Sequence, residues 1–68
     1  MPLIHVQMLT GRTASQKADF IREVAVVAQR TLQVPERAVT IIINEVDHAH
    51  WGVGQSTMEA IRSAKDSA

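Results

Sequence analysis

Two residues near the start of the chain could take part in acid–base chemistry, Pro2 through its nitrogen and Arg12 through its guanidinium group. Pro2 follows Met1, and an initiator Met before a residue as small as Pro is normally removed, which would leave Pro2 at the N-terminus. The nitrogen of an N-terminal proline is a secondary amine with a free lone pair, whereas an internal proline has an amide nitrogen. Arg12 supplies a permanent positive charge further along. A base and a cation of this kind suit removal of a proton next to a carbonyl group.

The environment of Pro2 decides whether its amine can act as a base. Burial at the start of a strand and a cation nearby, such as Arg12, would both disfavour the charged amine and lower its pKa towards neutrality. The alternative interpretation is that Pro2 is a strand-edge proline without chemistry and that Arg12 is a solvated loop residue. Retention of Met1 would also remove the base, because Pro2 would then be an amide.

The elements that must position these residues follow from the apolar pattern. Ile4, Val6 and Met8 alternate with polar residues, which predicts a strand with one buried face that Gly11 interrupts. Thr13-Ala14-Ser15-Gln16 fits a capping box, and a helix is expected from there to about Leu32. Its apolar stripe has helical spacing and comprises Phe20, Ile21, Val24, Ala25, Val27, Ala28 and Leu32.

A second strand is expected from Val39 to Val46, where β-branched residues dominate. Val34-Pro35 ends the helix before it, because proline disfavours helical geometry in the preceding residue. Strand, helix and strand form a βαβ unit, which implies an α/β fold with parallel strands and a right-handed crossover. The segment 47–54 is expected to be a loop, 55–61 either a helical turn or part of a hairpin, and 62–68 a frayed tail.

Length and composition indicate one domain, residues 1–68, whose own core contributes little stability. A core of this size supplies only about 3–5 kcal/mol, and the chain has no cysteine for disulfides. Ile42 and Val46 face away from the side of the sheet that one helix can cover, so self-association is expected. Seven basic residues balance seven acidic ones, which argues against nucleic-acid or anionic-membrane partners. We expect no signal peptide and a cytoplasmic location.

The layout resembles the 4-oxalocrotonate tautomerase family of the tautomerase superfamily. The resemblance runs without gaps from Pro2 to about Gly54. It is carried by Pro2 after Met1, Leu9-Thr10-Gly11-Arg12, Gln16-Lys17, Ile21-Arg22-Glu23-Val24, the isoleucine-rich second strand ending in Glu45, and Trp51-Gly52-Val53-Gly54.

This resemblance implies a keto–enol tautomerase without cofactor or metal that acts on a small 2-hydroxy-dienoate or enol keto acid. It implies that Pro2 is the general base, that Arg12 binds the substrate carboxylate or polarises its carbonyl, and that Trp51 stands where the family has an aromatic residue. Trp51 could equally be an interface anchor. The resemblance further implies a homohexamer, built as a trimer of dimers.

Two positions depart from the family pattern. Thr40 stands where the archetype has a second arginine, so a monocarboxylate should be handled about as well as a dicarboxylate. Arg37 lies shortly before it and is a candidate replacement for that charge, although a strand-entry arginine is usually solvated. Gln55 stands where the archetype continues with glycine. Both departures affect which substrate is expected, whereas the expected fold and general base stay the same.

Two other functions remain open. Dehalogenases and hydratases of unsaturated acids in the superfamily add a carboxylate, in one branch at the position of Val53, which counts against them. A non-catalytic oligomeric binding protein is the third possibility, and Thr40 or a retained Met1 would favour it. His48 and His50 have the spacing of a ligand pair and His5 is a third candidate, but two loop histidines without a further paired ligand do not predict a metal site.

Overall fold

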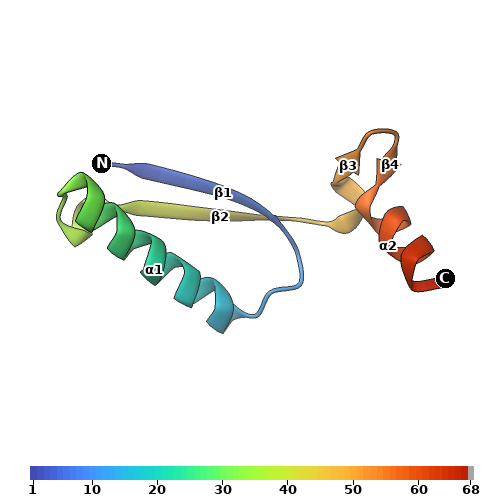
Figure 1. Cartoon of the computed structure of the whole chain (residues 1–68), viewed down its shortest axis with the longest axis horizontal. Coiled ribbons are helices and arrows are strands. Elements are labelled where there is room, and N and C mark those ends of the chain that lie inside the picture. Colours follow the sequence, from blue (N-terminus) through green and yellow to red (C-terminus); the bar gives the residue numbers. More distant parts are fainter. Residues whose placement is uncertain (68) are drawn as a thin grey trace.

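The computed structural model describes residues 1–67 and the side-chain exposure of residues 1–65. Strand β1 (Leu3–Leu9), helix α1 (Ala14–Leu32) and strand β2 (Thr40–Val46) follow one another. The two strands pair in parallel, in a register that runs from Leu3 opposite Thr40 to Leu9 opposite Val46. Figure 1 shows α1 lying along one side of this two-stranded sheet. The predicted βαβ unit is confirmed.

Helix α1 begins at the predicted capping box. The Gln16 amide donates to the Thr13 hydroxyl at 3.0 Å, and the Thr13 amide donates to the Gln16 side chain at 3.0 Å. The helix ends at Leu32, where Gln33 takes a left-handed conformation, and a 3₁₀ turn, η1 (Glu36–Ala38), leads into β2. In the described part of the chain, neither α1 nor any other helix is long and apolar enough to cross a membrane.

The sheet presents two different faces. Ile4 and Val6 of β1 alternate with exposed neighbours and lie on the face towards α1, as do Ile41 and Ile43 of β2, their partners in the register. An ion pair of 2.6 Å between Lys17 Nζ and Glu45 Oε1 ties the first turns of α1 to the end of β2. No element within residues 1–67 covers the opposite face, where Leu3 is 55% and Ile42 is 43% exposed.

The C-terminal region has more regular structure than its sequence indicates. The expected loop contains a 3₁₀ turn, η2 (His48–His50), and strand β3 (Gly52–Val53), which forms an antiparallel hairpin with β4 (Ser56–Thr57). Helix α2 (Met58–Ser67) follows, so the expected frayed tail is wrong as far as Ser67, and Ala68 lies outside the described residues. The Thr57 hydroxyl accepts a bond from the Ala60 amide at 3.1 Å, and this contact at the first turn stabilises the helix start.

A single chain encloses almost no core. Among residues 1–65, only Ala28 is buried, with 5% of its surface exposed. The chain exposes 5238 Å², whereas a compact protein of 7.5 kDa exposes about 4,200 Å². Its radius of gyration is 15.8 Å, against about 11 Å for a compact domain of this length. The excess arises because the hairpin and α2 project away from the βαβ unit (Figure 1).

Candidate active site

Pro2 lies at the end of the sheet where both strands begin. It is half-buried, and its carbonyl oxygen accepts a hydrogen bond of 3.0 Å from the Thr40 amide, the first residue of β2. This bond fixes the position of Pro2 relative to the sheet. Met1 ahead of it is 82% exposed. Met1 is therefore accessible to solvent, and the hydrogen bond to Thr40 does not involve it.

Arg12 lies beyond the other end of β1. Gly11 has a φ of +129°, a conformation that residues with a Cβ rarely adopt, and it turns the chain between β1 and α1. Arg12 lines a cavity of about 270 Å³ together with Met8, Gln16, Lys17 and Phe20. Because Lys17 is paired with Glu45, Arg12 is the cation of this cavity that remains available for an anionic ligand.

Pro2 and Arg12 do not meet within one chain. The seven residues of β1 that separate them span about 23 Å, at roughly 3.3 Å per strand residue. Our expectation that Arg12 lies near Pro2 is therefore wrong for a single chain, because an extended strand holds its two flanking residues apart. A site that contains both must draw them from different copies of the chain.

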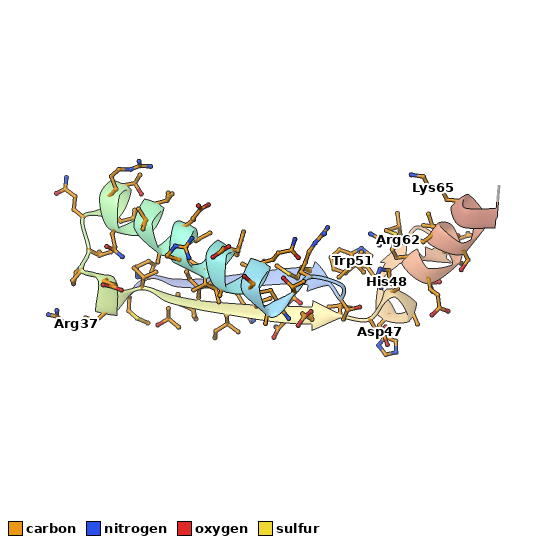
Figure 2. All side chains as sticks on the ribbon, turned by 90° about the horizontal axis from the view of Figure 1, so that it is seen from below. Arg37, Asp47, His48, Trp51, Arg62 and Lys65 are labelled. Carbon is orange, nitrogen blue, oxygen red and sulfur yellow. The ribbon has the colours of Figure 1, made fainter. Side chains whose placement is uncertain are left out.

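Trp51 lies at the same end of the molecule as Arg12. It follows η2 and is half-buried, and its carbonyl oxygen accepts a bond of 2.7 Å from the Met58 amide at the start of α2. A contact of 3.4 Å between the His48 Nδ1 and the Thr10 hydroxyl connects η2 to the end of β1. Figure 2 shows Trp51 near His48 and Arg62, far from Arg37.

Arg37 lies at the Pro2 end. It belongs to η1, is exposed, and marks the opposite extremity of the chain from Trp51 in Figure 2. Thr40 begins β2 at this end too, because its amide bonds to Pro2. The structure thus sorts the sequence-predicted residues into two groups. Pro2 and Arg37 lie at one end of the sheet, and Arg12 and Trp51 lie at the other.

Arg62 is a further cation near Arg12 that the sequence does not indicate as a site residue. Arg62 of α2 lines a second cavity, of about 250 Å³, whose other lining residues are Met8, Leu9, Thr10, Gly11 and Arg12. The sequence places Arg62 in the expected tail, and no sequence pattern connects it to Arg12, fifty positions earlier. Among the described residues, no group of three potential metal ligands lies together.

Comparison with known proteins points to one family. A family model described as tautomerase enzyme matches residues 2–60. A 2-hydroxymuconate tautomerase of Stutzerimonas stutzeri is 38% identical over 61 residues, which cover 90% of this chain and 97% of the relative. A probable tautomerase of Ralstonia nicotianae is 47% identical over 53 residues, which cover 78% of this chain and 76% of the relative.

Solved structures agree with the sequence comparisons. A 4-oxalocrotonate tautomerase isozyme from Methylibium petroleiphilum superimposes with a TM-score of 0.89 at 33% identity, covering 93% of this chain and 98% of the other. A heterohexameric 4-oxalocrotonate tautomerase from Chloroflexus aurantiacus superimposes with a TM-score of 0.84 at 39% identity, covering 91% and 100%. The predicted family resemblance is confirmed.

Proposed function

Since this chain belongs to the tautomerase family, and is an isomerase, we propose that it tautomerises a small 2-hydroxy-dienoate or enol keto acid with Pro2 as the general base. The observation that carries the proposal is that the family match begins at Pro2 and includes Arg12 and Trp51. Met1 is 82% exposed, which supports its accessibility to cleavage. Its removal would turn the Pro2 nitrogen into a free amine.

The chemistry needs a group that accepts a proton and later returns it. The neutral Pro2 amine takes the hydroxyl proton of the enol, the double bonds shift, and the amine returns the proton to carbon, so that the base is regenerated. The guanidinium of Arg12 binds a carboxylate or stabilises the negative charge that develops on oxygen. The indole of Trp51 excludes water, which strengthens both effects.

The separation of Pro2 from Arg12 leads us to propose that the site forms between copies. In a two-fold dimer whose strands run antiparallel across the interface, the Pro2 end of one copy lies beside the Arg12 end of the other. The exposed apolar residues of a single chain, among them Leu3, Ile42 and Val27, support such an assembly. A hexamer made of three such dimers is the assembly we propose.

The activity can be tested on the purified protein after mass spectrometry of its N-terminus. Enolised keto acids absorb in the ultraviolet, so their conversion can be followed directly in buffer without added cofactor. We expect the protein with free Pro2 to accelerate ketonisation of a 2-hydroxy-dienoate or of enolised phenylpyruvate. A rate equal to that of buffer for both classes of enol would contradict the proposed function and favour a binding protein.

A further inference from the structure

Arg12 and Arg62 are brought to one cavity by two distant segments of the chain. Arg12 follows β1, Arg62 belongs to α2, and the cavity of about 250 Å³ is lined by both. The remaining lining residues, Met8, Leu9, Thr10 and Gly11, carry no charge. Figure 2 places Arg62 on the side of α2 near Trp51 and His48, whereas Lys65 extends from the far end of the helix.

Among the side chains of residues 1–65, no carboxylate forms an ion pair with the two arginines of this cavity. The ion pairs found among the described side chains are Lys17 with Glu45 and Arg22 with Asp19, and neither involves Arg12 or Arg62. Two guanidinium groups around one small cavity repel each other, and each anionic group that enters relieves this repulsion. A ligand with two carboxylates therefore gains more than a ligand with one. Guanidinium groups also bind carboxylates in a bidentate geometry.

We infer that Arg62 is a second substrate-binding cation, which together with Arg12 selects substrates that carry two carboxylates. This inference rests on the proposed function, because the ligand it describes is the substrate of that reaction. It reverses the expectation drawn from Thr40 that mono- and dicarboxylates are handled alike. Arg37 lies at the other end of the sheet and does not line this cavity within one chain.

Binding of unreactive acids tests the inference without relying on catalysis. Titration calorimetry of the assembled protein with adipate, which has two carboxylates, and with hexanoate, which has one, gives the two dissociation constants. We expect wild type to bind adipate more tightly, and Arg62→Ala to weaken adipate binding about tenfold, as loss of one charged hydrogen bond predicts. Hexanoate binding should change less.

Two variants on the same helix serve as controls. Arg62→Lys keeps the charge and should retain more adipate affinity than Arg62→Ala. Lys65→Ala removes an exposed cation of α2 that does not line the cavity, and it should change adipate affinity by less than about twofold. Equal effects of Arg62→Ala and Lys65→Ala would overturn the inference, as would equal binding of adipate and hexanoate to wild type.

The test separates this inference from the proposed function. A protein that ketonises enols but whose adipate affinity does not depend on Arg62 overturns the inference alone. A protein that binds adipate through Arg62 but does not accelerate ketonisation supports the anion site and overturns the proposed function. Both measurements use the same preparations of wild type and of Arg62→Ala, because calorimetry and the ultraviolet assay are both carried out on the assembled protein.

Discussion

A protein that keeps one additional residue ahead of Pro2 should lose tautomerase activity by about 10²–10⁴-fold, the contribution of a positioned acid–base group. In such a protein the Pro2 nitrogen is an amide, and its lone pair is delocalised into the carbonyl group. The measurement is kcat/KM for ketonisation of an enol acid, compared with the protein whose N-terminus is Pro2. Mass spectrometry of both preparations establishes which N-terminus each one has.

The structure indicates that this change is confined to the amine. Pro2 is held by its carbonyl oxygen, which bonds to the Thr40 amide, and a preceding residue extends into solvent as Met1 does. The oligomer should therefore stay intact, and sedimentation checks this. Pro2→Ala with a free N-terminus is the matched control, since it keeps a basic amine and should retain part of the activity. A blocked and assembled protein with the normal rate would show that Pro2 is not the base.

The second large effect is expected at the uncovered face of the sheet. Ile42→Asp should dissociate or unfold the assembly, because Ile42 is 43% exposed in the single chain and lies on the face that no described element covers. Covering an isoleucine contributes about 1.5–3 kcal/mol, and burying an unpaired carboxylate costs several kcal/mol more. Sedimentation at micromolar concentration should show smaller species, and activity should fall with the oligomer.

A charge placed elsewhere provides the comparison for Ile42→Asp. Ser15→Asp adds the same charge at an exposed position in the first turn of α1, where the helix dipole favours it, and should leave the assembly unchanged. If Ile42→Asp instead sediments like wild type and keeps its activity, this face of the sheet is not an interface. A folded wild-type monomer at micromolar concentration would contradict the proposed assembly as a whole.

The βαβ unit was predictable because its signals are local. Alternating residues such as Ile4 and Val6 mark a strand, Thr13 and Gln16 mark a helix start, and the β-branched run in β2 marks a second strand. A strand, helix and strand of these lengths leave few arrangements other than a parallel pair. The general base Pro2 stays a prediction, and it depends on the neighbour of Met1 rather than on the fold.

The arrangement of the site was less predictable because it depends on contacts between distant segments. Arg12 is a candidate for a cation near Pro2, yet β1 holds the two residues apart within one chain. The segment after Val46 has short strands and no long apolar period, so the sequence left residues 55–61 open between a helical turn and part of a hairpin, whereas the structure has both, β4 and then α2. Without α2, nothing connected Arg62 to the cavity beside Arg12.

The most direct test of a site shared between copies is complementation of two inactive proteins. One carries an extra residue ahead of Pro2, the other carries Arg12→Ala, and the two are mixed in equal amounts, dissociated and reassembled. If Pro2 and Arg12 come from different copies, about a quarter of the sites in the mixture combine an intact amine with an intact guanidinium, and activity should reappear to about that extent. Native mass spectrometry verifies that hybrids have formed. Hybrids that are no more active than the two parent proteins would contradict a site in which Pro2 of one copy works with Arg12 of another.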